Sequence, residues 1–228
     1  MAQAKNRKGI GNAATGTNKP LSARARSAQL TRDSVLKAAI RVFAKYGLNG
    51  GSIEKISSAA KSHDRMIYYY FGNKEGLFVA VLEETYRRFN EAEAKVEIDP
   101  DDPELSLRRL VEFIVNYYHD HPEFVILLNS ENLHRGKHVA KSELAQQYSS
   151  TAISVFSDVL LAGQKKGVFR EDLSARDLYM MVAAMGYFYQ SNRYTLSAFL
   201  GEKLEKSETF SAWENFVMDA VLRTVTTK

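Results

Sequence analysis

The chain has 228 residues, 45% of them hydrophobic, which suffices for one large or two small domains with a substantial core. Its net charge is +4. Its lack of cysteine excludes disulfide bonds and thiolate metal sites, and suits a reducing compartment. No apolar run of about 18 residues and no signal-peptide pattern is present, so we expect a cytoplasmic protein that does not span a membrane.

The first 32 residues are strongly basic. They contain seven Lys or Arg residues and no Asp or Glu, whereas the charges of the remaining residues sum to −3. Residues 1–29 also have almost no large apolar side chains, so we predict a disordered basic arm there. Such an arm suits the phosphates of nucleic acid, although a solvated tail without a partner would have the same composition.

Three helices are predicted in the next segment, residues 30–75. The first runs from Thr31, which suits a helix cap, to Gly47, with apolar residues at helical spacing between them. Two short helices follow, at about 53–60 and about 63–70. Two short helices joined by a tight turn are the layout of a helix-turn-helix, whose second helix enters the major groove of DNA; an ordinary helical hairpin is the alternative.

The rest of the chain, residues 76–228, is predicted to form an antiparallel helical bundle. A long helix starts at about residue 74, and the proline-containing segment 99–103 is a clear break after it. Further helices are predicted at about 104–119, 122–134, 140–166, 174–199 and 207–226. No alternating strand pattern competes, so the predicted fold class is all-α: a three-helix DNA-binding domain containing the helix-turn-helix, followed by the bundle.

The segment from Ser52 to Leu77, SIEKISSAAKSHDRMIYYYFGNKEGL, resembles the DNA-binding segment of the TetR/AcrR family of bacterial transcriptional regulators. The likeness lies in the Ser52 cap, the apolar helix positions, the Tyr-x-x-Phe that ends at Phe71 and the Lys-Glu-x-Leu run from Lys74. It covers about residues 31–78. The resemblance implies a ligand-responsive regulator, usually a repressor, that binds a (pseudo)palindromic operator in double-stranded DNA as a homodimer and is released by a small-molecule effector.

One position departs from the family pattern. The turn between the two short helices has Lys61-Ser62 where the family has Gly-Val. If the turn is unchanged, Lys61 has to adopt a left-handed backbone, at a cost of roughly 1–2 kcal/mol. The same lysine is also a candidate for a phosphate contact.

Candidate DNA contacts lie on and around the second short helix. Ser52 caps a helix N-terminus, where free N–H groups suit a phosphate oxygen. Arg65 suits guanine, and Asp64 either accepts from cytosine or orients Arg65. Three consecutive tyrosines cannot all face one way on a helix, so at least one is expected in the core, and Tyr69 either contacts DNA or packs inward. The candidates are Ser52, His63, Asp64, Arg65, Tyr68, Tyr69, Tyr70 and Lys74, with Arg24 and Arg26 of the arm reaching the minor groove or acting as a loose tether.

The bundle is expected to hold the effector, as the resemblance implies. Methionine and aromatic side chains line adaptable apolar pockets, although each of them is also an ordinary core residue. Two asparagines after an apolar run would either orient a ligand or satisfy each other at a helix end. The candidate lining residues are Phe113, Tyr117, Asn129, Asn132, Phe156, Met181, Met185 and Tyr189. Residues 121–138 resemble, more weakly, the sensor domains of the RutR-like subgroup.

The last two long helices are expected to form the dimer interface, because the resemblance implies a four-helix contact between two copies. Small residues on the first of them would allow a close approach, and the second carries a broad apolar stripe. These residues are Ala183, Ala184 and Gly186, and then Phe210, Trp213, Phe216, Val217, Ala220 and Val221.

Two other function classes remain open. A metal-binding helical protein or a metalloenzyme would use several acidic and histidine side chains at helical spacing, but Gly136 is expected to break that helix. The candidate ligands are Glu131, His134 and His138, with His119 and His121 nearby. No catalytic triad or nucleotide-binding glycine loop is visible, so we expect no enzyme activity, cofactor or metal. An architectural DNA-binding protein would need the basic arm but no sensor domain.

Overall fold

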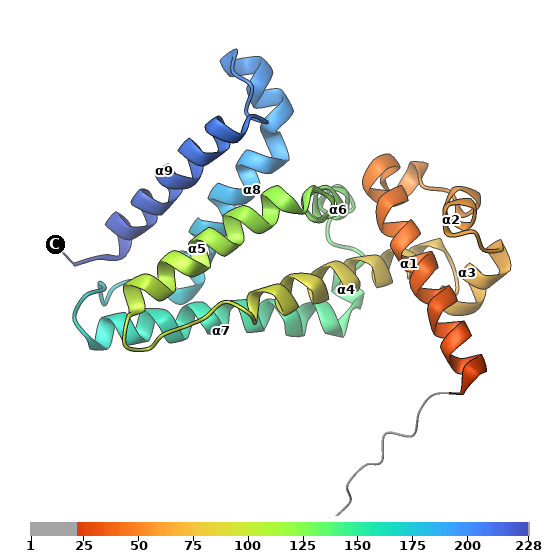
Figure 1. Cartoon of the computed structure of the whole chain (residues 1–228), viewed down its shortest axis with the longest axis horizontal. Helices are drawn as coiled ribbons and strands as arrows, with labels where there is room; N and C mark the ends of the chain where they lie inside the picture. Colours follow the sequence, from red (N-terminus) through yellow and green to blue (C-terminus); the bar gives the residue numbers. More distant parts are fainter. Residues whose placement is uncertain (1–21, 228) are drawn as a thin grey trace, which may run out of the picture.

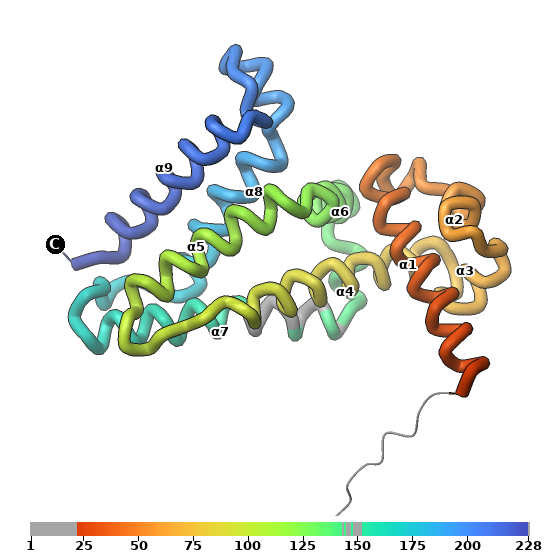
Figure 2. Tube along the Cα trace, viewed as in Figure 1, coloured from red at the N-terminus to blue at the C-terminus, as the bar shows by residue number. Residues whose placement is uncertain are grey.

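The computed structural model describes residues 22–227, apart from the side chains of residues 143, 145, 146 and 148–151 (Figure 2). Most of the predicted basic arm, with Lys5, Arg7, Lys8 and Lys19, lies outside the described residues. The described part is all-α, as predicted. Its helices are α1 (Ala23–Gly50), α2 (Ile53–Ala60), α3 (Asp64–Phe71), α4 (Lys74–Glu93), α5 (Pro103–Asp120), α6 (Pro122–Leu133), the 3-10 helix η1 (Val139–Lys141), α7 (Glu143–Lys165), α8 (Ala175–Leu200) and α9 (Ser207–Val225).

Two apolar cores organise these helices. The smaller core joins α1, α2, α3, the first half of α4 and Leu127 of α6, and the larger core joins the second half of α4 to α5, the start of α6 and α7–α9. In Figure 1, α1–α3 lie on one side and α5, α8 and α9 on the other, and α4 reaches from one group to the other. Helix α4 therefore belongs to both: Leu77 and Phe78 are fully buried in the first core and Phe89 in the second. The domain boundary between residues 75 and 76 stays a prediction, because a continuous helix crosses it.

The first helix begins at Ala23, so the predicted start at Thr31 and the predicted disorder up to residue 29 were wrong for the described residues. Ser22 is the cap, and its hydroxyl accepts a hydrogen bond from the Ala25 N–H at 3.2 Å. Alanine, arginine, glutamine and leucine dominate this stretch and are good helix formers even without an apolar stripe. The predicted end is better supported, because Gly47 has φ +68° and kinks the helix there.

The connection between α6 and α7 contains the break that was predicted at Gly136. Arg135 and Gly136 both have positive φ, of +59° and +72°, and the chain resumes as η1. None of the described helices is both long enough and apolar enough to cross a bilayer.

Candidate nucleic-acid interface and sensor site

Helix α3 is held by a single fully buried side chain, Ile67, which packs in the smaller core. The opposite side of the helix faces solvent and carries exposed His63, Arg65, Tyr68 and Tyr69. Helix α3 lies at one end of the described part of the molecule (Figure 1). An exposed helix with polar and aromatic side chains on its outer face is the element that enters a DNA groove in a helix-turn-helix protein.

The three consecutive tyrosines lie differently from the prediction that at least one of them is in the core. Tyr68 and Tyr69 are 52% and 77% exposed, and Tyr70 is half-buried. The Tyr70 ring lies 5.1 Å from the Tyr69 ring and 6.3 Å from the Phe71 ring. The helix lies on the surface with only Ile67 pointing straight inward, so both of its flanks remain in contact with solvent.

The turn before α3 adopts the left-handed geometry that was anticipated for Lys61. This residue has φ +52° and ψ +44°, and its N–H donates to the Ser58 carbonyl at 3.2 Å. The next N–H, of Ser62, donates to the Ser57 carbonyl at 2.9 Å. From α1, the Ser34 hydroxyl donates to the Ala60 carbonyl at 3.1 Å. The end of α2 is thus satisfied by hydrogen bonds, although no glycine is present in the turn.

The charge of this domain is strongly positive. Residues 22–75 contain ten Lys or Arg against four Asp or Glu, and one of those acids, Glu75, is paired with Lys137 at 2.9 Å. The Lys74 ammonium lies 3.4 Å from the Asn49 carbonyl, and that of Lys55 donates to the Gly50 carbonyl at 2.9 Å. Each ammonium has three donors and uses one in this contact, which fixes the cation beside the helix-turn-helix.

The remaining candidates also lie on this side of the molecule. The Ser52 hydroxyl caps α2 by accepting from the Lys55 N–H at 3.3 Å, and half-buried Asp64 opens α3. Arg24 and Arg26 are exposed on the first turn of α1, so they are part of a helix and not of an extended arm.

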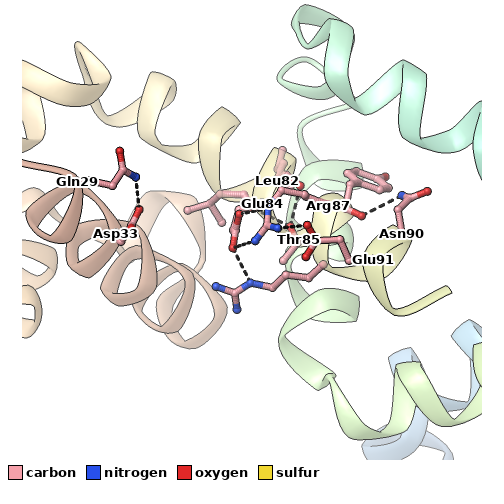
Figure 3. Close-up of polar contacts among 11 residues, drawn as sticks. Gln29, Asp33, Leu82, Glu84, Thr85, Arg87, Asn90 and Glu91 are labelled. Carbon is pink, nitrogen blue, oxygen red and sulfur yellow. Dashed lines mark hydrogen bonds and ion pairs between the residues drawn. The ribbon is translucent and has the colours of Figure 1, made fainter. Parts of the chain in front are cut away.

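The junction between the two cores is polar on one side. A cleft of about 470 Å³ separates α1 from α4 and is lined by Arg32 and Lys37 among others. On α4, the Glu84 carboxylate binds Arg87 and Arg88, each at 2.8 Å, and Arg87 also reaches Glu91 (Figure 3). These ion pairs are partly solvated, so they contribute little stability and mainly keep the cleft charged.

On the other side, the junction is closed by a buried acid and a buried histidine. The Glu131 carboxylate accepts from the His138 Nδ1 at 2.7 Å, from the His138 N–H at 2.6 Å and from the Val139 N–H at 3.0 Å. The His138 ring meets Phe78 edge-on at 5.1 Å, and Phe78 meets Phe43 of α1 at 5.3 Å. We call Glu131, His138 and the chain between them the α6–η1 corner; it inserts into the smaller core.

The histidines considered as metal ligands each have another contact. His134 faces its own helix, with its Nδ1 at 2.7 Å from the Ser130 carbonyl. His119 stacks on Phe210 at 3.8 Å, and His121 lies 3.3 Å from Glu123. Within residues 22–227, no group of three His, Asp or Glu side chains is arranged to hold a metal ion.

The predicted effector-lining residues are spread over several places in the larger domain. Phe113 and Tyr117 line a groove of about 490 Å³ beside the α4–α5 connection, whereas Phe156 is fully buried 5.7 Å from the Tyr179 ring. Tyr189 donates to the Leu204 carbonyl at 2.8 Å, on the α9 side. The half-buried methionines Met181 and Met185 pack against the larger core. Asn129 and Asn132 both form hydrogen bonds with the Tyr187 hydroxyl. The Asn129 amide also donates to the Ser191 hydroxyl at 3.0 Å.

A polar cluster in the interior of this domain was not predicted from the sequence. Glu93, on the last turn of α4, is only 3% exposed, and burial raises its pKa to about 7. Burial also raises the pKa of Tyr118, on α5, well above its usual value. The charge of Glu93 also acts on the phenols of Tyr118 and Tyr179, on α5 and α8. One signal was available: Glu93 continues the apolar stripe of α4 through Tyr86 and Phe89 at helical spacing.

Helices α8 and α9 present apolar side chains to solvent. Phe188 is 55% exposed and Phe216 56%, and both line a groove of about 480 Å³. Not all of the predicted interface residues lie there. Gly186 is buried against α5, where an added Cβ would lie 3.1 Å from the Tyr118 ring. Phe210, Val217 and Val221 are also buried, in the molecule's own core, because the apolar face of α9 packs on α5 and α8.

Comparisons with known proteins agree on both halves of the chain. Residues 35–81 match the family model of bacterial regulatory proteins, tetR family, and residues 103–221 match a Tetracyclin repressor-like C-terminal domain. The HTH-type transcriptional repressor NicS of Pseudomonas putida is 52% identical over 200 residues, covering 88% of this chain and 94% of NicS. The HTH-type transcriptional repressor SCO4008 of Streptomyces coelicolor is 32% identical, covering 71% and 79%.

Two further comparisons are more limited. The regulator RutR of Escherichia coli is 33% identical over 67 residues, which cover 29% of this chain and 32% of RutR. A solved regulatory protein from Rhodococcus RHA1 superposes with a TM-score of 0.67 over 87% of this chain and 98% of that chain. Its sequence identity of 18% makes this a likeness of fold alone.

Proposed function

Because the chain belongs to the tetR family of bacterial regulatory proteins, it is a transcriptional regulator, and we propose that it represses by binding a (pseudo)palindromic operator as a homodimer and leaves the operator when a small molecule binds. The observation that carries this proposal is the solvent-facing side of α3, with Arg65, Tyr68 and Tyr69 exposed beside several cations. Action on chromosomal DNA is also the reason for proposing a cytoplasmic location.

The proposed DNA contacts divide into two kinds. Arg65 and His63, at the start of α3, are placed to read base edges in the major groove, with Asp64 orienting Arg65. The others serve the phosphates, which set position and affinity. This second group consists of Ser52, Tyr68, Tyr69, Tyr70 and Lys74, with Arg24 and Arg26 on α1 reaching the flanking backbone or minor groove.

The proposed dimer uses the exposed apolar surface of α8 and α9. Phe188 and Phe216 leave an apolar surface larger than scattered single side chains would give, since both line one groove with Leu200 and Trp213. A two-fold contact through this surface would present two α3 helices to the two half-sites of one operator.

The proposed release passes through α4. Its first residue, Lys74, lies beside the helix-turn-helix, and near its other end Phe89 and Glu93 are buried in the larger domain. A ligand that prefers a different placement of α4 would change the spacing of the two α3 helices. The ligand shifts the protein away from its DNA-binding conformation only if it binds the other conformation more tightly.

The test is operator selection from random duplex DNA with the full chain, followed by affinity measurements on the selected site. Arg65→Ala is expected to weaken discrimination at one base pair by about 1–3 kcal/mol. Lys74→Ala is expected to weaken binding to all sequences alike and to lower the slope of log affinity against log salt concentration by about 1. Arg176→Ala and Lys95→Ala are the matched controls, since both cations are exposed on the larger domain.

Absence of any salt-sensitive duplex binding would overturn the proposal. Operator binding that no metabolite in a library releases would favour an architectural protein instead.

A further inference from the structure

We propose that Glu93 is the anchor of the effector site and that the effector carries a positively charged nitrogen next to an aromatic or aliphatic body. This inference rests on the proposed function, because it names the class of molecule that the larger domain senses.

The first observation is the state of the Glu93 carboxyl group. It is 3% exposed, and its Oε1 has no hydrogen-bond partner among the described residues. One turn earlier, the buried Oδ1 of Asn90 also lacks a partner there, while its amide donates to the Tyr86 carbonyl at 3.0 Å (Figure 3). Two acceptors on one helix turn have thus left water without gaining donors, which is costly unless a ligand supplies them.

The second observation is what surrounds these acceptors. Tyr118 of α5 and Tyr179 of α8 lie close enough to Glu93 for its charge to raise their pKa further. Phe156 of α7 stands edge-on to Tyr179, at 5.7 Å. Aromatic rings around a carboxylate favour a cation in two ways: the ring quadrupole attracts it, and so does the negative charge of the carboxylate. No ion pair of Glu93 with a Lys or Arg occurs in the described part of the chain, so that charge is available to a ligand.

The third observation is the acidic groove beside the α4–α5 connection, whose wall packs on the turn of α4 before Glu93. Its aromatic wall, Phe113 and Tyr117, packs on Phe89 at 5.4 and 4.9 Å, and Phe89 lies one turn before Glu93 on α4. The groove is lined by three carboxylates against one arginine, namely Glu97, Glu112 and Asp120 against Arg109. An acidic groove raises the local concentration of cations and repels anions, which favours the same class of ligand.

The experiment is thermal unfolding of the full chain with three probes of one shape: benzylamine, benzyl alcohol and benzoate, at a pH near 7.5. Benzylamine is expected to raise the Tm of the wild type by about 2–4 °C at saturating concentration, and the other two to leave it unchanged. Glu93→Gln should abolish the shift. Glu91→Gln should keep it, because Glu91 is an exposed acid on the same helix.

A second measurement separates a ligand anchor from a structural acid. The raised pKa means that the folded protein holds a proton on Glu93 that the unfolded chain has lost, so stability falls as the pH rises from about 4.5 to about 7 and then stays level. The titratable groups that face Glu93, Tyr118 and Tyr179, have raised pKa values and stay uncharged in this range. Without probe, Glu93→Gln and Glu93→Leu should therefore have a higher Tm than the wild type at pH 8.

Three results would overturn the inference: stabilisation by benzoate or benzyl alcohol equal to that by benzylamine, a benzylamine shift that survives in Glu93→Gln, or no shift of the wild type with any probe. A lower Tm of both Glu93 variants at pH 8 would also count against it. Operator binding of the wild type is measured in parallel. If it is intact, any of these results refutes the effector class alone, whereas loss of operator binding refutes the proposed function.

Discussion

At the scale of single residues, Lys61 shows how the chain keeps a turn for which it lacks the usual residue. A left-handed lysine costs about 1 kcal/mol or more relative to glycine, and the turn persists because two backbone hydrogen bonds and the Ser34 hydroxyl close the end of α2. Its ammonium is exposed next to α3. We propose that this charge contacts the DNA phosphates, which would offset the cost of the strained backbone.

Two substitutions at this position separate strain from charge. Lys61→Gly is expected to raise the free energy of unfolding by about 1 kcal/mol relative to Lys61→Ala, because only glycine adopts this backbone without strain. Both remove the ammonium, so both should weaken operator binding equally. Urea unfolding and operator titration measure the two effects. A glycine variant less stable than the alanine variant would contradict the assignment of strain.

At the scale of helices, caps and apolar spacing within one helix predicted the structure better than anything in the sequence predicted contacts between distant helices. The second helix was predicted at 53–60 and found there, because Ser52 caps it and Ile53 and Ile56 give its apolar face. The start of α1 was missed because an exposed helix has no apolar periodicity to detect. The cluster around Glu93 was missed because it depends on which faces of α4, α5 and α8 meet, and no short-range pattern contains that information.

The α6–η1 corner is the helix-scale feature with the clearest energetic consequence. Glu131→Ala is expected to lower the free energy of unfolding by about 3 kcal/mol, since it leaves two backbone N–H groups and a buried imidazole without their acceptor. Glu123→Ala, at a partly exposed acid of the same helix, should change it by less than about 1 kcal/mol. Equal losses in the two variants, measured by urea unfolding, would show that the corner is not a stabilising contact.

At the scale of the whole molecule, the surface of α8 and α9 exposes several large apolar side chains in residues 22–227, among them Phe188, Phe199 and Phe216. Its groove has a volume of about 480 Å³, and α8 and α9 lie away from α3 (Figure 1). A dimer formed there leaves both DNA-binding domains free to reach the operator.

This arrangement predicts a monomer when the surface is charged. Phe188→Glu combined with Phe216→Glu should give a monomer in sedimentation velocity and lower operator affinity by at least tenfold, because each copy then binds one half-site alone. Leu133→Glu, at an apolar residue of α6 that is 84% exposed, should stay dimeric and bind normally. A double variant that still sediments as a dimer would place the interface elsewhere.

The 20 residues of α4 span about 30 Å, from Lys74 to Glu93. The proposed effector anchor and the proposed DNA contacts therefore lie at opposite ends of this helix, so we expect substitutions around Glu93 to change effector specificity without altering the residues that contact DNA. For a biosensor built on this protein, the specificity for the inducer and the specificity for the promoter could then be changed independently, because α4 connects the two sites without mixing their residues.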